Sequence, residues 1–118
     1  MLRGMLELAT KVRLVVLNAC SLSEMGSEFV SFGVPHVVCC SADLKDSLSH
    51  VFFRSFYSEL FQSASVDRAF HSALIALRSH SERSAQAASH HFQLLPEGRH
   101  EEVLFPKDLE AEALSHFE

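Results

Sequence analysis

The sequence lacks the features that would point to a membrane, a nucleic acid or the secretory route. No apolar run approaches the roughly 20 residues that a membrane-spanning helix needs. Lys and Arg number 10 against 15 Asp and Glu, and they are scattered, so a net charge of −5 gives no attraction to phosphate backbones. The first residues, MLRGMLELATK, contain no small-residue cleavage site. We therefore expect no membrane partner, no nucleic-acid partner and no secretory signal.

Cysteine is also scarce, and its three occurrences do not form a disulfide framework. Cys39 and Cys40 are adjacent, and adjacent cysteines rarely bridge each other without strain. Because no second cysteine pair exists to complete a zinc site, we interpret them as buried strand residues rather than metal ligands. Free thiols favour a reducing, cytoplasmic setting. We expect neither a metal nor a cofactor.

What the sequence does contain is enough apolar residues for one small core, since 47% of its 118 residues are hydrophobic. Val12 to Asn18 is continuous and aliphatic after Arg13, which is typical of a strand buried on both faces of a parallel sheet. HVVCC (His36 to Cys40) is a second such strand. Between them, SLSE at 21–24 matches the capping-box pattern of a helix start, and Gly33 is suited to end that helix. The order strand, helix, strand predicts an α/β fold with a mostly parallel sheet flanked by helices.

The remainder of the chain is predicted to be mainly helical. The expected elements are a helix from Asp43 or Ser41 to about Phe61, a helix from Ser65, a loop over 79–89, a third strand at His91 to Leu95, and a short fourth strand at 102–105. The helix assignments rest on apolar residues spaced three and four apart. Residues 106–118 form an acidic tail that is a weak helix candidate.

Cys20 is the first candidate for chemistry, because it follows the first strand and precedes a predicted helix start. In open α/β sheets, ligands collect at the carboxyl ends of the strands. Amides at a helix start also lower the pKa of a nearby thiol and favour the nucleophilic thiolate. The alternative is that Cys20 is a small buried hydrophobic residue.

A thiolate nucleophile needs a base, normally a histidine that is close in space. The chain has eight histidines, and no pattern places any of them beside Cys20. His36 opens a strand, at the opposite end from its carboxyl terminus. His50 and His71 fall within predicted helices on partly exposed faces. His90 and His91 precede the third strand, which we interpret as the wrong end for a partner of Cys20.

Six segments in this order resemble the CHAT domain, a caspase-like peptidase module related to separases and caspases: LVVLNAC, GVPHVVCC, DLKD, FFRSFYSEL, SVDRAF and HHFQLLPEG. The resemblance runs from about Lys11 to Phe105 and matches the C-terminal part of the family's domain. We therefore assign residues 1–105 to a partial CHAT domain and 106–118 to the tail. The resemblance implies a partial caspase-like three-layer sandwich.

The resemblance also implies roles for single residues. Cys20 falls on the family's catalytic nucleophile, and Asn18 falls where related peptidases line the pocket for the residue before the cut bond. Asp46 falls on a recurrent aspartate that opens the helix after the second strand. Asp43 and Asp46 together are candidates for an acidic substrate pocket that selects a basic residue. The alternative for both aspartates is capping at a helix N-terminus.

The chain departs from the family at the second catalytic residue. The family's histidine lies in a His-Gly pair upstream of the cysteine, whereas no histidine precedes Cys20 and no His-Gly pair occurs in this chain. We therefore expect a cysteine-peptidase lineage that is inactive as this chain alone. The alternatives are a non-catalytic interaction module and a truncated gene product. The short sheet leads us to expect a protein or peptide partner, or an upstream segment, that completes it.

Overall fold

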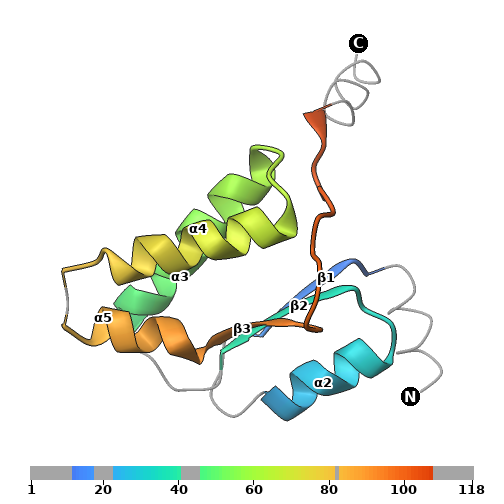
Figure 1. Ribbon diagram of the computed structural model, residues 1–118, viewed down its shortest axis with the longest axis horizontal. Coiled ribbons are helices and arrows are strands. Elements are labelled where there is room, and N and C mark those ends of the chain that lie inside the picture. Colours follow the sequence, from blue (N-terminus) through green and yellow to red (C-terminus); the bar gives the residue numbers. More distant parts are fainter. Residues whose placement is uncertain (1–11, 18–22, 41–45, 82, 108–118) are drawn as a thin grey trace.

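Three strands and four helices make up the part of the chain described by the structure, a computed structural model covering residues 12–17, 23–40, 46–81 and 83–107. In chain order they are β1 (Leu14–Leu17), α2 (Ser23–Ser31), β2 (His36–Cys40), α3 (Asp46–Phe61), α4 (Val66–Arg78), α5 (Arg83–Ala88), a single 3-10 turn (Ser89–His91) and β3 (Phe92–Leu95). Helix α2 covers one face of the sheet, and α3, α4 and α5 lie on the other (Figure 1). This layered arrangement confirms the predicted α/β class. None of the helices in the described ranges is long and apolar enough to cross a membrane.

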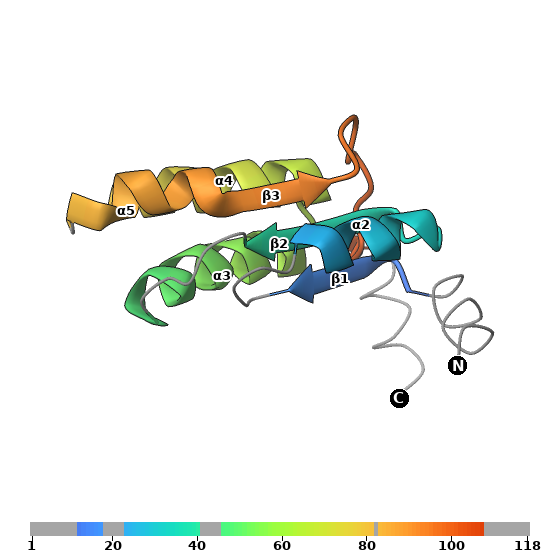
Figure 2. The ribbon, with the colours of Figure 1, turned by 90° about the horizontal axis from the view of Figure 1, so that it is seen from below.

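The sheet is built around β2, with the strand order β1-β2-β3. β1 pairs with β2 in parallel, and Leu14 lies opposite His36. β3 pairs with the other edge of β2 in the antiparallel direction, so that Phe92 lies opposite Cys40. Figure 2 shows the arrowheads of β1 and β2 pointing the same way and that of β3 pointing back. The parallel arrangement expected from the sequence is therefore present in β1 and β2, and β3 makes the sheet mixed.

Alternation along the strands divides their side chains between two apolar cores. On the α2 side, Val37 is buried with Val34, and Val15 and Leu17 pack against them. On the other side, Val38 and Cys40 join the buried residues of α3, α4 and α5 in a larger core. All five residues of β2 are buried because both of its faces and both of its edges are covered. β1, which has one paired edge, has four residues of intermediate exposure.

An aromatic cluster forms the centre of the larger core. The ring of Phe52, on α3, stacks on that of Phe92, on β3, with 3.9 Å between the ring centroids. The edge of Phe70, on α4, meets Phe52 at 5.7 Å, and Phe56 stacks on it at 6.0 Å. All four rings are buried. Because they belong to three elements, their contacts fix α3 and α4 on the sheet.

Helix α2 approaches the sheet closely through Gly26. A Cβ atom at this position would lie 3.1 Å from Cδ1 of Leu95 and 3.3 Å from Sγ of Cys39. The helix ends as predicted at Gly33, whose φ of 98° lies in the left-handed region that favours glycine. Its N–H donates to the carbonyl of Val30 at 3.0 Å. α2 is therefore short, close to the strands and sharply terminated.

Two sequence predictions about secondary structure are wrong. Residues 83–88 form α5 rather than a loop, because Ala85 and Ala88 supply a buried face that is too small to register as an apolar stripe. Residues 102–105 do not form a strand. Their segment instead lies at the start of α4, where the carbonyl of Glu102 accepts the N–H of Val66 at 3.0 Å. The predicted start at Ser65 is confirmed, since its side chain accepts the N–H of Arg68.

Candidate active site

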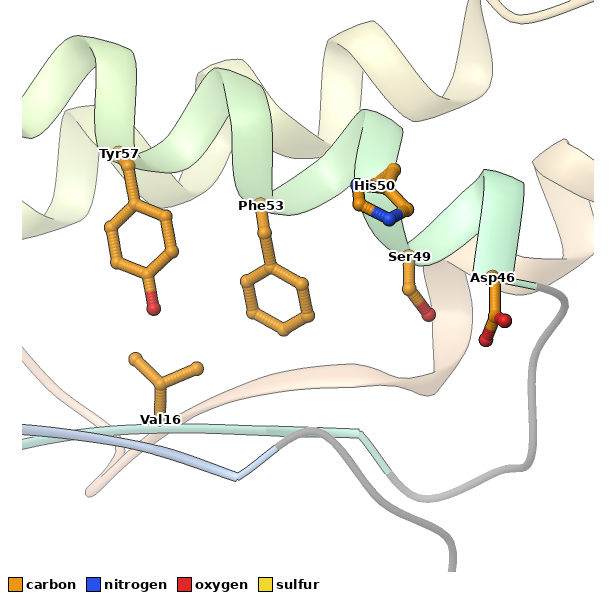
Figure 3. A pocket seen from close by; sticks show the side chains of 6 residues that line it. All are labelled: Val16, Asp46, Ser49, His50, Phe53 and Tyr57. Atoms are coloured by element: carbon orange, nitrogen blue, oxygen red, sulfur yellow. The ribbon is translucent and has the colours of Figure 1, made fainter.

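A pocket of about 350 Å³ opens between β1 and α3. It is lined by Val16 of β1 and by five residues of α3: Asp46, Ser49, His50, Phe53 and Tyr57. In Figure 3, the side chains of Asp46, Ser49, Phe53 and Tyr57 extend from α3 toward the strands, and Val16 points up from β1 to meet the two rings. The volume is at the low end of the range for ligand sites, so the pocket fits a small group such as one side chain of a peptide.

The polar end of the pocket is formed by the first turns of α3. Asp46, Ser49 and His50 stand at positions i, i+3 and i+4, which places them on one side of the helix. Asp46 is in the first turn, where a carboxylate interacts favourably with the helix dipole. Asp46 and His50 are exposed, while Ser49 is buried. This end of the pocket therefore presents a carboxylate and an imidazole to solvent above a buried hydroxyl.

The other end of the pocket is apolar. The rings of Phe53 and Tyr57 stack with 6.1 Å between their centroids, and Val16 closes the strand side. Burial raises the pKa of the Tyr57 phenol, which therefore stays protonated at neutral pH and can donate a hydrogen bond. The pocket thus combines an apolar wall with an acidic rim.

Of the four site residues that the sequence singles out, the structure describes one. Asn18, Cys20 and Asp43 lie outside the described residues. Asp46 is the first residue of α3 and lines the pocket. The strand predicted to lead to Cys20 does form, and it ends at Leu17, the residue before Asn18.

The comparison with known families identifies the domain. A family model for the CHAT domain matches residues 1–106 of this 118-residue chain. The chain belongs to the CHAT-domain family. A comparison with curated proteins gives no match. The family match agrees with the resemblance seen in the sequence and extends over most of the chain.

Some of the described histidines of this CHAT domain lie at the two ends of the sheet. His36 is at the amino end of β2, as predicted. The prediction for His90 and His91 is wrong, because β3 is antiparallel and begins opposite Cys40. Both histidines therefore precede β3 at the end of the sheet where β1 and β2 terminate.

His50 and Ser49 are pocket residues that sequence reasoning did not select. His50 lies in a helix on an exposed face, as predicted, but that face borders the pocket. The signal that could have found both residues is their spacing from Asp46 at the start of the helix that follows the second strand.

The cysteine pair of the CHAT domain is in β2, as predicted. Both cysteines are buried. Burial raises the pKa of the Cys39 thiol, so Cys39 is a poor nucleophile at neutral pH. Among the residues that the structure describes, no group of three His, Cys, Asp or Glu side chains could hold a metal ion.

Proposed function

We propose that this CHAT domain is the nucleophile-bearing part of a caspase-like cysteine peptidase, with Cys20 as the nucleophile. Asn18 and the acidic residues Asp43 and Asp46 line the pocket for the residue before the cut bond. The chain by itself does not hydrolyse peptides, because it has no histidine at the family's catalytic position. A longer chain or a partner that brings a His-Gly pair to the site completes the enzyme.

The family match over residues 1–106 carries this proposal. The fold supports it, because β1 ends one residue before Asn18 and the pocket adjoins β1. In open α/β sheets, this is the end of the strands where ligands bind. The small number of cysteines, whose spacing does not form a disulfide framework, supports a reducing compartment, so we place the protein in the cytoplasm.

The chemistry explains why the histidine matters. In a cysteine peptidase, a base takes the thiol proton, the thiolate attacks the peptide carbonyl, and the same group then protonates the departing amine. Losing acid–base assistance costs a factor of roughly 10²–10⁴ in rate. A thiol at the position of Cys20 therefore keeps some reactivity toward an electrophile while peptide hydrolysis is lost.

Asp46 supports a preference for a basic residue before the cut bond. Its carboxylate stands at the rim of a pocket whose inner wall is apolar. A Lys or Arg side chain could lay its methylene groups along Phe53 and Tyr57 and place its charge near Asp46. If Asp46 had only a structural role, its carboxylate would stabilise the N-terminus of α3 and would not bind a substrate side chain.

A second candidate is a non-catalytic interaction module. The observation in its favour is the edge of β1, since within the described strands β1 pairs only with β2. An open strand edge can accept an extended segment of a protein or peptide partner. In this function the sheet is completed by a partner, and Cys20 has no chemical role.

Labelling with a thiol-reactive peptide separates the two functions. The probe is a short peptide that ends in Arg and carries an electrophilic ketone, and the labelled residue is identified by mass spectrometry. We expect Cys20 to react faster than a free thiol of the same pKa, and Cys20→Ser to abolish the reaction. Cys39→Ser, which removes a buried thiol, is the matched control and should leave labelling unchanged. Labelling of Cys20 no faster than a free thiol would favour the interaction module.

Replacing Asp46 by Asn tests the pocket in the same assay. If Asp46 binds the basic residue, Asp46→Asn slows labelling by the Arg peptide and leaves labelling by a matched peptide ending in Leu unchanged. An equal effect on both peptides would show that Asp46 serves only the helix.

A further inference from the structure

A row of four polar side chains crosses the amino ends of β1 and β2, at the opposite end of the sheet from the polar rim of the pocket. Arg13 immediately precedes β1, and His36 is the first residue of β2. His100 and Glu102 belong to the segment that follows β3. Figure 1 shows this segment, in orange to red, passing the ends of β1 and β2 on its way to α4. The row therefore joins the segment after β3 to two strands that precede it in the chain by more than fifty residues.

The contacts along the row are short. Arg13 Nη2 donates to Glu102 Oε1 at 2.8 Å, and Glu102 Oε1 lies 2.7 Å from His36 Nε2. His36 Nδ1 lies 2.7 Å from His100 Nδ1, and His100 Nε2 lies 2.6 Å from the carbonyl oxygen of Pro96. Both imidazoles are buried, with 4% of His36 and 3% of His100 exposed. Water therefore cannot easily substitute for a missing partner.

The number of protons follows from these contacts. The Pro96 carbonyl can only accept, so His100 Nε2 must carry a proton. The contact between the two Nδ1 atoms needs one proton, and the contact between His36 Nε2 and the Glu102 carboxyl needs another. Three protons are required, whereas two neutral imidazoles and an ionised carboxylate carry only two. Without the third proton, one of the three contacts brings two acceptors together.

The third proton resides on one of the two imidazoles, His36 or His100, because the Glu102 carboxyl is held in its ionised form. The hydrogen bond from Arg13 lowers the pKa of Glu102, so its carboxyl stays ionised. Burial lowers the pKa of His36, the hydrogen bond to Glu102 opposes this effect, and the charges of His100 and Arg13 add to it. From α4, Asp67 meets the segment only through its backbone N–H, and its carboxylate pairs with His71. Whichever imidazole carries the third proton, the contacts to Pro96, between the two Nδ1 atoms and to Glu102 then each hold one proton.

We propose that this row is a proton-dependent latch that holds the segment after β3 against the sheet and the start of α4. With three protons the latch is closed, and the carbonyls of His100 and Glu102 accept the N–H groups of Asp67 and Val66 at 2.8 and 3.0 Å. The closed form binds one proton more than the open form, so a rise in pH favours opening. Opening exposes the first turn of α4 and the amino ends of β1 and β2 to solvent.

Hydrogen exchange of two amides tests the latch in the full chain. The amides of Val66 and Asp67 report closure, because their acceptors are on the segment. After correction for intrinsic exchange rates, we expect their protection to fall about tenfold between about pH 6 and about pH 8, the loss expected for one buried contact. His90→Gln, which removes an exposed histidine, is the control and should behave like the native chain. Equal protection of both amides at the two pH values would overturn the proposal.

Glu102→Gln distinguishes a latch from a merely structural cluster. The amide of Gln can donate to a neutral His36 Nε2, so two imidazole protons then satisfy all three contacts. We expect this variant to keep both amides protected at both pH values. Protection lost equally at both pH values would mean that Glu102 acts only as an anchor, and would overturn the proposal. Ring ¹⁵N spectra of the native chain give an independent readout, since one imidazole of the pair, His36 or His100, must be doubly protonated at the lower pH.

Discussion

At the scale of single residues, Phe52 shows how the position of a side chain within one helix decides its contribution to the stability of the fold. It stacks on Phe92 and meets Phe70, and it is fully buried. Phe61, near the end of the same helix, is 61% exposed and touches Phe105 at the surface. Both are phenylalanines on α3, so they form a matched pair for mutation.

We expect Phe52→Ala to lower the free energy of unfolding by about 3–5 kcal/mol, because it leaves a cavity where three elements meet. Phe61→Ala should cost about 0.5 kcal/mol or less, as is usual for exposed positions. Urea denaturation followed by circular dichroism measures both. Similar losses for the two variants would contradict the central place of Phe52 in the core.

Single residues also show where sequence reasoning succeeds. The start of α4 at Ser65 follows from hydroxyl capping, and the end of α2 at Gly33 follows from the freedom of glycine at positive φ. Both are local effects that a sequence displays directly. The place of His50 in the pocket could not be predicted in this way, because it depends on which face of α3 turns to the pocket. His36 and His100 are 64 residues apart in the chain, and no local sequence pattern predicts their contact.

At the scale of elements, the distance between α2 and the sheet depends on one missing side chain. Gly26 allows the helix backbone to lie against Leu95 and Cys39. Replacing it with Leu would force the helix away from the strands, whereas Ala would press only on the side-chain ends of Leu95 and Cys39, which need to shift slightly, and would gain helix propensity.

We therefore expect Gly26→Leu to destabilise the fold by about 1–3 kcal/mol, as overpacking generally does. Gly26→Ala should be close to neutral. Glu28→Leu introduces the same side chain at an exposed position of α2 and serves as the control. Thermal unfolding followed by circular dichroism compares the three variants. Equal stability of Gly26→Leu and Glu28→Leu would rule out a close approach at Gly26.

The packing of α5 and the direction of β3 account for one of the two errors of secondary structure and for the error about the histidines before β3. α5 is buried through alanines, which carry little hydrophobic signal in a sequence. The direction of β3 is set by the path of the chain across the larger core. The residues FQLL would suit a strand in either direction, so the sequence of β3 does not reveal which one it takes. The existence of β3 was therefore predictable, whereas its direction was not.

At the scale of the whole molecule, the sheet is unevenly covered. β2 is enclosed, but β1 has one edge that no described strand occupies. Natural proteins protect such edges with charges or with a partner, and β1 itself contains only aliphatic residues. We expect copies of this chain to associate through that edge when no other partner is present.

Val16→Lys tests this expectation, because it places a charge on β1 in the open pocket, where the side chain can reach water. We expect it to weaken self-association by roughly tenfold in Kd, equivalent to about 1.4 kcal/mol. Ile75→Lys, at an exposed site on α4, makes a similar change away from the edge and should have no effect. Sedimentation equilibrium measures both. A native chain that stays monomeric at all concentrations would contradict the prediction.

The reversal of β3 has a practical consequence for how the domain can be joined to other proteins. Since β3 runs back, the described polypeptide enters the sheet at Arg13 and leaves it at Pro96 on the same side. Reporter proteins or surface tethers attached beside Arg13, or at the exposed residues 97–99, would therefore lie on that side of the sheet. Fluorescent or immobilised versions of the domain should consequently keep access to the opposite rim, where Asp46 stands.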